Sequence, residues 1–326
     1  MENIKKIQVK YYHYLILSGV LWGFTPFIYK KTLLVTSIMG LLLFKYFFGT
    51  ILLYVYDHKK YVKIVKTAWP TLFLFITFGT LIPSFLFPFG LSMTSALHAS
   101  FISLSFPFFV YIFARIFLKD TIHKRVIFGS ILASTGLLIL LFGSDNSGNS
   151  SIIGDLVMLT SQMFAAFGVV FSRKLLVKKH VMPPEQLAFF EYIFAFFGYL
   201  VLTIIFSQIV YYNIQSSMSI IWLVLTASIA GSVPLLLYYR SVQHLPAERI
   251  PDINFISPLV GSLVAIFLLN ESVTIVFVIG AIILLIGLLF SNDKLHPLIW
   301  GTHIHNKERS ILNKIIDFEK SIITRI

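Results

Sequence analysis

The stretch GSILASTGLL, residues 129–138, recurs 151 residues later as GAIILLIGLL, residues 280–289. The same shift needs no gap from Gly79 to Leu138, and it superimposes further identical residues: Pro83 on Pro234, Ala96 on Ala247, Pro107 on Pro258 and Leu118 on Leu269. Backbone geometry dictates where glycine and proline can stand, so their coincidence at one shift indicates a duplicated fold. The chain is predicted to be two copies of one unit.

The composition indicates that lipid surrounds both copies. Of the 326 residues, 57% are hydrophobic and 12% are charged, and the mean hydropathy is +0.86. A span needs about 20 mostly apolar residues to cross the hydrocarbon of a bilayer. Ten such stretches are expected, at about 12–31, 37–56, 70–93, 96–117, 125–142, 153–172, 187–209, 219–239, 248–269 and 273–290. The sequence predicts an all-α polytopic membrane protein with five helices in each copy.

Five spans per copy make the second copy enter the membrane from the side on which the first one leaves it, so the two repeats are predicted to be inverted. Lys and Arg gather in short cytoplasmic loops. With the amino terminus inside, the inner segments hold 23 of the 26 basic residues. Both termini are therefore expected in the cytoplasm, and the protein in the cytoplasmic membrane.

This topology divides the chain into five parts. They are a cytoplasmic amino terminus at 1–11, a first five-helix repeat at 12–142, an extracytoplasmic linker at 143–152, a second repeat at 153–290 and a cytoplasmic tail at 291–326. In the tail, Ile311, Ile315, Phe318 and Ile322 recur at helical spacing. This pattern favours an amphipathic helix on the inner leaflet, with a loosely ordered tail as the alternative.

The net charge of +12 is interpreted as an orientation signal and an attraction for anionic lipid. Nucleic-acid binding is not expected, because no basic cluster with interleaved aromatics lies on a soluble domain. The chain has no cysteine, which excludes disulfides and thiol chemistry. His296, His303 and His305 lack a carboxylate frame, so no metal site and no cofactor are expected.

Lys45 and Glu191 are ionisable residues well inside predicted spans. Phe44-Lys45-Tyr46 matches Phe190-Glu191-Tyr192 at a shift of 146, so the repeat carries a base in one half and an acid in the other. Their expected depths differ by about 10 Å, which a bridging substrate or water closes more easily than a direct pair. A buried bridge that only fixes helix packing is the structural alternative. In the functional interpretation, Lys45 attracts a carboxylate or phosphate, and Glu191 attracts an amine or takes up a proton.

Prolines and a second acid complete the candidates within the spans. Prolines at matching places suit helices that bend around a cavity between repeats; the candidate bend points are Pro26, Pro83, Pro107, Pro234 and Pro258. Asp252 lies about one turn inside the ninth span, three residues from Arg249. A local ion pair and a proton or ion-coupling site are both open for it.

The chain resembles the EamA-type repeat of the drug/metabolite transporter superfamily over roughly residues 12–290. The resemblance is carried by the segments 94–107, 118–120, 129–138, 246–258, 269–271, 280–287, 22–23, 154–155 and 172–175. Members usually carry Arg at the place of Lys45, and Lys keeps the charge without the guanidinium fork.

The resemblance implies two inverted five-helix bundles around a central cavity lined mainly by the first four helices of each half. It implies these cavity residues: Trp22, Lys45, Phe85, His98, Ser103, Glu191, Tyr238 and Asn254. It also implies alternating-access transport of a small organic metabolite, such as an amino acid exported outward. Import or exchange of a nucleotide-type metabolite such as S-adenosylmethionine is the alternative.

Other classes of function fit the sequence less well. No HExxH, GxSxG or paired-carboxylate signature is present, so an intramembrane enzyme is not expected. A channel or receptor is a third possibility, which saturable counterflow would separate from a transporter. The expected partners are a small-molecule substrate and membrane lipid, with the protein a monomer or a weak homodimer.

Overall fold

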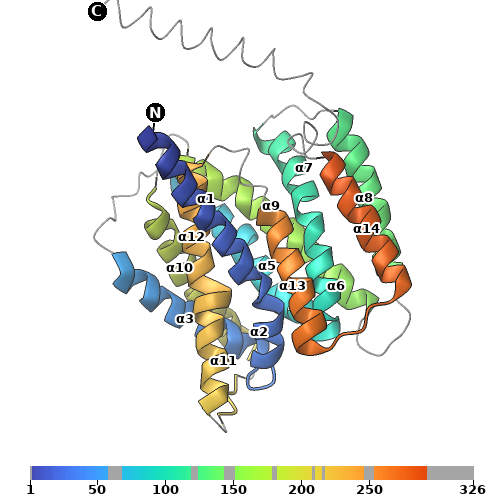
Figure 1. Ribbon diagram of the computed structural model, residues 1–326. Helices are drawn as coiled ribbons and strands as arrows, with labels where there is room; N and C mark the ends of the chain where they lie inside the picture. The colour runs from blue at the N-terminus through green and yellow to red at the C-terminus, as the bar shows by residue number, and fades with distance from the viewer. Residues whose placement is uncertain are drawn as a thin grey trace, which may run out of the picture.

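The structure, a computed structural model, describes residues 2–57, 68–118, 124–142, 151–177, 182–207, 210–214, 217–245 and 253–291. Within these residues the regular structure is helical, apart from one isolated β-bridge between Thr36 and Tyr212. The helices pack side by side into a bundle, and the chain starts at one end of it (Figure 1). The all-α prediction is confirmed for this part of the chain. The predicted tail helix, most of the 143–152 linker and Asp252 lie outside the described residues.

The helices follow the predicted spans closely. Their bounds are α1 Glu2–Gly23, α2 Thr25–Thr32, α3 Ile38–Asp57, α4 Trp69–Leu74, η3 Phe75–Leu81, α5 Ile82–Met93, α6 Ala96–Ile102, η4 Ser103–Ser105, α7 Phe106–Leu118, α8 Lys124–Phe142, α9 Ile152–Val177, α10 Pro184–Ile205, α11 Ser217–Ala227, η5 Ser228–Ser232, α12 Val233–His244, α13 Ile253–Leu269 and α14 Ile275–Ser291. Several ends differ from the prediction. Helices α9 and α12 each continue about five residues further, to Val177 and His244. Helix α1 begins well before residue 12, and α10 stops before residue 209, where Ser207 takes a left-handed backbone with φ of 47°.

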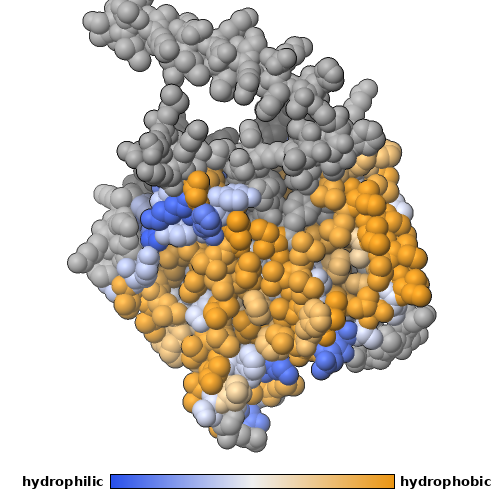
Figure 2. All heavy atoms as spheres, in the orientation of Figure 1, coloured by the Kyte–Doolittle hydropathy of each residue, from blue (hydrophilic) through white to orange (hydrophobic). Residues whose placement is uncertain are grey.

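The exterior of the bundle is apolar. Figure 2 shows a hydrophobic band across the middle of the visible face, with hydrophilic residues toward both ends. Large side chains stay open to the surroundings, such as Phe267 at 73% exposed. Six helical segments are long and apolar enough to cross a membrane: Ile38–Tyr56, Trp69–Met93, Ala96–Phe117, Ile152–Val177, Pro184–Ile205 and Ser217–His244. Such a surface needs lipid around it, so the chain is a multi-pass membrane protein. The count of ten spans stays a prediction.

Two helical segments contain a wide π-helical turn directly before a proline. Element η3 precedes α5, whose second residue is Pro83, and η5 precedes α12, whose second residue is Pro234. Proline lacks an N–H, and its ring collides with the preceding turn, so a wider turn relieves the clash. Ser161 donates to the Pro83 carbonyl at 3.0 Å, and Ser18 donates to the Pro234 carbonyl at 2.7 Å. The two matched prolines therefore have matched surroundings.

The other three candidate bend points differ from one another. Pro26 is the second residue of α2, which begins after the turn at Phe24. Pro107 is the second residue of α7, directly after the 3-10 turn η4. Pro258 lies inside α13, which continues through it as one α-helix. A break in the regular α-helix thus accompanies four of the five prolines, whereas α13 continues through Pro258. Bending at these prolines stays a prediction.

Helices α8 and α14 pack against each other through glycines. A methyl group added to Gly136 would lie 2.3 Å from the backbone nitrogen of Leu284, and one added to Gly287 would lie 2.2 Å from that of Ala133. The repeat relates the two contacts, because Gly287 lies 151 residues after Gly136 and Leu284 lies 151 residues after Ala133. Residue numbers fall along α8 as they rise along α14, so the helices run antiparallel. The same contact is thus made twice, with the roles of the two helices exchanged.

Helices α3 and α10 also meet through residues that the repeat relates. The rings of Tyr46 and Tyr192 are 4.8 Å apart and meet edge to face, and these residues are related by the shift of 146. Both are buried. Lys45 and Glu191 are their neighbours in the chain, so this contact brings the two predicted charges to the same region of the molecule.

Candidate functional site

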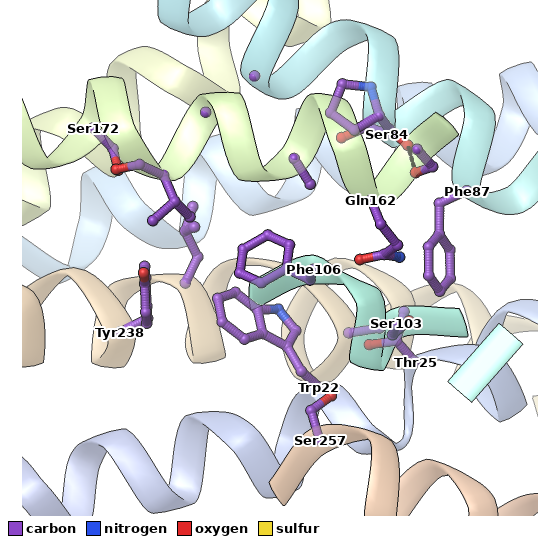
Figure 3. A pocket seen from close by; sticks show the side chains of 18 of the residues that line it. Trp22, Thr25, Ser84, Phe87, Ser103, Phe106, Gln162, Ser172, Tyr238 and Ser257 are labelled. Atoms are coloured by element: carbon purple, nitrogen blue, oxygen red, sulfur yellow. Dashed lines mark hydrogen bonds between the residues drawn. The ribbon is translucent and has the colours of Figure 1, made fainter. Parts of the chain in front are cut away.

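A cavity of about 310 Å³ lies between the helices (Figure 3). The residues that line it come from α1–α3, η3, α5–α7, η4, α9, α10, η5, α12 and α13. Among the described residues, α8 and α14 contribute nothing to the lining. The glycine-packed pair therefore stands apart from the site, as the family resemblance implies for the last helix of each repeat.

Positions that correspond in the two repeats line the cavity together. The pairs are Trp22 with Ala165, Thr25 with Gly168, Pro26 with Val169 and Tyr29 with Ser172 at a shift of 143; Lys45 with Glu191 at 146; and Gly79 with Ala230, Ser84 with Leu235, Phe87 with Tyr238 and Phe106 with Ser257 at 151. The two members of a pair usually differ in size or charge. The site thus lies between the repeats, and its two sides carry different chemistry.

Glu191 supplies the negative charge of the cavity. Its side chain is only 8% exposed. Thr80 donates to Oε1 at 3.1 Å, and Tyr239 donates to Oε2 at 2.5 Å. Two hydroxyl donors stabilise the ionised form of a buried carboxylate, although they do not neutralise its charge. The carboxylate of Glu191 can therefore bind a cationic group or a proton.

Lys45 supplies the positive charge. Its Nζ lies 4.9 Å from the ring centroid of Tyr46 and 5.8 Å from that of Tyr29, within the range of cation–π attraction. Among the described residues no carboxylate oxygen comes within 4.0 Å of this nitrogen, so Lys45 and Glu191 form no direct ion pair. Both line the same cavity. The buried bridge considered from the sequence is therefore not formed, and both charged residues border one cavity.

Three further predicted residues line the cavity: Trp22, Ser103 and Tyr238. The rings of Trp22 and Tyr238 lie 5.4 Å apart and form part of one aromatic wall. Asn254 lies in α13, and its side chain is outside the described set.

Phe85 and His98 do not line the cavity, contrary to the prediction. On α5 the residues that line it are Pro83, Ser84 and Phe87, whereas the ring of Phe85 stacks on that of Phe89 with the centroids 5.7 Å apart. The family resemblance did not determine which side of α5 faces the cavity. His98 lies near the start of α6, where another network holds it.

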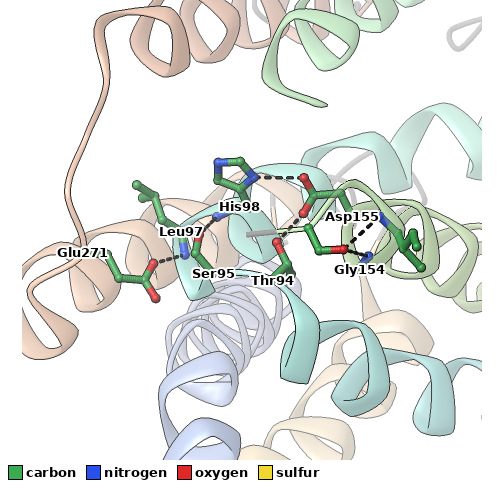
Figure 4. A network of polar contacts seen from close by, with 9 residues as sticks. Thr94, Ser95, Leu97, His98, Gly154, Asp155 and Glu271 are labelled. Carbon is green, nitrogen blue, oxygen red and sulfur yellow. Dashed lines mark hydrogen bonds and ion pairs between the residues drawn. The ribbon is translucent and has the colours of Figure 1, made fainter. Parts of the chain in front are cut away.

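Figure 4 shows this network, at the end of the bundle where α6 begins. The Nδ1 atom of His98 lies 3.0 Å from Oδ2 of Asp155, which is fully buried, and Thr94 donates to Oδ1 of the same carboxylate. The His98 ring also stacks on Phe277 at 5.4 Å. These contacts join α6, α9 and α14, so His98 has a structural position rather than a place in the cavity.

Glu271 closes the same end of the bundle from the second repeat. Its Oε1 accepts from the backbone N–H of Ala96 at 2.8 Å, and its Oε2 accepts from that of Leu97 at 2.7 Å. Lys30 Nζ lies 3.5 Å from Oε1. The carboxylate thus caps α6 and attracts α2, which ties three distant segments together.

A second charged cluster lies at the end of the bundle where α12 finishes. Arg240 donates through Nε and Nη2 to Oε1 of Glu185, at 2.8 and 2.5 Å, and through Nη1 to the hydroxyl of Tyr56 at 3.0 Å. The cluster joins α3, α10 and α12. Polar contacts between repeats therefore exist at both ends of the bundle, with the cavity between them.

Comparison with known proteins identifies the family. The sequence profile of the EamA-like transporter family matches residues 9–142 and 152–292, one match for each repeat. The chain belongs to the EamA-like transporter family. A solved crystal structure of a protein resembles this EamA-like chain with a TM-score of 0.65, covering 89% of this chain and 99% of the other at 14% identity, which shows the fold alone. A search of curated proteins finds no match.

Several lining residues were not predicted from the sequence: Thr25, Tyr29, Ser84, Gln162 and Tyr239. Gln162 had one usable signal, because it is an amide within an apolar span. Tyr239 and Thr25 had none, since Tyr and Thr are common on every face of membrane helices. Their position in the site depends on how the two repeats are packed.

Proposed function

We propose that this EamA-like protein is a secondary transporter that exports a small organic metabolite, an amino acid or a related compound, by alternating access. The observation that carries the proposal is the cavity between the repeats. It is lined by corresponding positions of both repeats, and it holds one amine and one carboxylate that do not pair with each other.

The proposal includes ten spans arranged as two inverted repeats, 12–142 and 153–290, in the cytoplasmic membrane with both termini inside. The antiparallel, reciprocal contact of α8 with α14 supports it, since an axis lying in the membrane plane relates antiparallel equivalents. The contact of Tyr46 with Tyr192 is reciprocal in the same way. The distribution of Lys and Arg supports the orientation.

In this proposal Lys45 binds an anionic group of the substrate, and Glu191 binds a cationic group or takes up a proton. An unpaired charge inside a membrane protein is costly, and it is retained where it faces a ligand or a water-filled path. Tyr239 and Thr80 orient the carboxylate of Glu191 toward the cavity. Trp22 and Tyr238 cover the apolar part of the substrate.

Alternating access requires the two ends of the bundle to open in turn. The Glu271 contacts with α6 and Lys30 would hold one end closed, and the Arg240 contacts with Glu185 and Tyr56 would hold the other. Each cluster joins segments that are distant in the chain, so either one can separate without unfolding a helix.

The test is counterflow in proteoliposomes against a panel of amino acids, nucleotides and S-adenosylmethionine. At least one compound is expected to show saturable exchange, and Lys45→Met and Glu191→Gln are each expected to reduce it strongly. Lys31→Met makes the same chemical change outside the cavity lining and serves as the control. Normal exchange in both cavity variants, or no exchange with any compound, would contradict the proposal.

A further inference from the structure

Thr25 and Gln162 line the cavity, and neither side chain has a hydrogen-bond partner among the described residues. The hydroxyl of Thr25 is buried and lacks any partner within 3.5 Å. Gln162 is only 7% exposed, and its amide makes no side-chain hydrogen bond in the described part of the chain. Buried polar groups are nearly always paired, and leaving one unpaired costs about 1–3 kcal/mol. The buried Thr25 hydroxyl therefore calls for an explanation. The Gln162 amide lines the same cavity and is available to a ligand.

Several serine hydroxyls that line the cavity are paired. Ser100, Ser103, Ser161 and Ser172 donate to the backbone carbonyls of Ala96, Ala99, Pro83 and Val169, and the hydroxyl of Ser84 pairs with that of Tyr46. The Thr25 hydroxyl, which is buried and has no partner, differs from these five.

Thr25 and Gln162 face each other across the cavity. Figure 3 shows Gln162 extending from α9 toward the region of Thr25 and Ser103, with Phe87 on one side and Phe106 and Trp22 on the other. Thr25 belongs to the first repeat and Gln162 to the second. The positions that correspond to them in the other repeat, at a shift of 143, are Gly168 and Gly19, which have no side chain. The repeat therefore does not produce a second polar pair of this kind.

We infer that Thr25 and Gln162 form a neutral subsite for a planar group in which an N–H stands next to a carbonyl. A primary carboxamide and the lactam edge of a nucleobase share this chemistry. A glutamine amide offers one donor and one acceptor side by side and pairs with such an edge through two hydrogen bonds. The Thr25 hydroxyl adds a third, and the rings of Trp22 and Phe87 provide apolar walls for a planar group.

The subsite refines the proposed function, and it rests on that proposal only in assuming that the bound compound is also moved. Lys45 and Glu191 recognise charge, whereas Thr25 and Gln162 recognise an uncharged end. A site built to hydrogen-bond a ligand rejects an analogue that lacks the group, because its own buried polar atoms are then left unpaired. The pair is therefore a determinant of specificity.

The experiment compares nicotinamide with 3-acetylpyridine, in which a methyl group replaces the amide nitrogen. Binding to the purified full chain in detergent is measured by calorimetry, with uracil as the lactam probe. Nicotinamide is expected to bind roughly tenfold or more tightly than the ketone, since one lost buried hydrogen bond has about this effect. Relative binding of uracil and nicotinamide distinguishes a nucleobase from a carboxamide ligand.

Two variants test whether Gln162 and Thr25 cause the preference for nicotinamide over 3-acetylpyridine. Gln162→Leu is expected to bind both pyridines equally, and Thr25→Val to weaken nicotinamide by several-fold, while Thr160→Val on the exposed face of α9 changes neither. Thr25→Val keeps the shape of the side chain, so it remains informative if Gln162→Leu folds poorly. Equal binding of the two pyridines to the unmodified protein, no binding of any probe, or a preference that survives both variants would overturn the inference. Counterflow in the proteoliposome panel would still stand after such a result, so the two proposals fail separately.

Discussion

Replacing Gly287 with Ala tests the reciprocal contact between α8 and α14. The added methyl group would lie 2.2 Å from the backbone nitrogen of Ala133, and ordinary contact begins at 3.4 Å. The two helices must therefore separate by about 1.2 Å locally, the difference of these values. Backbone atoms cannot rotate away, unlike the end of a side chain, so the change has to be absorbed by the packing of the whole pair.

The magnitude follows from two opposing effects. Overpacking costs about 1–3 kcal/mol, and Gly→Ala in a helix returns about 1 kcal/mol of helix propensity. Gly287→Ala is thus expected to lower the free energy of unfolding by up to about 2 kcal/mol. Gly198→Ala in α10 is the matched control, because its methyl group meets only the side chain of Leu81, with the nearest δ-methyl at 3.0 Å. That side chain can shift, so the control should keep or raise the stability.

Thermal unfolding in detergent, followed by tryptophan fluorescence, measures the difference between the two variants. Gly136→Ala is expected to destabilise as much as Gly287→Ala, since its methyl group meets Leu284 in the equivalent way. The double variant should cost less than the sum, because either methyl group alone already separates the two helices. A Gly287→Ala protein as stable as the Gly198→Ala control, or fully additive effects in the double variant, would refute the reciprocal contact.

Three further predictions concern other contacts. Ala165→Phe should abolish ligand binding in calorimetry while the protein stays folded, because Ala165 lines the cavity and the ring would fill part of it; retained affinity would place the ligand elsewhere. Ser18→Ala and Ser161→Ala should each reduce thermal stability by about 0.5–1.5 kcal/mol, the value of one hydrogen bond to a proline carbonyl, and unchanged unfolding of both would show that these bonds contribute nothing. Glu271→Ala should destabilise by about 1 kcal/mol through loss of the α6 cap, and Glu271→Gln, which keeps one acceptor, by less; equal effects would assign the role to charge instead.

The cavity could be predicted only in part. Lys45 and Glu191 were accessible from the sequence, because a charge within an apolar span is conspicuous and the repeat relates the two positions. Phe85 and Phe87 could not be told apart, since both are phenylalanines of one predicted span and only the packing of α5 decides which one faces inward. His98 was misplaced for a similar reason. Its polarity suggested the cavity, whereas Asp155 from α9 holds it near the end of the bundle.

The sequence by itself determined the solvent, the helical class and the duplication. These depend on average hydropathy and on the spacing of glycine and proline, which are local properties that survive in any packing of the helices. Only the tertiary structure decided which side chains meet. It left Lys45 and Glu191 separate across a shared cavity, and it placed Thr25 opposite Gln162 from the other repeat. Such pairings join residues more than a hundred positions apart, and they follow from the packing of the two halves, which no local pattern encodes.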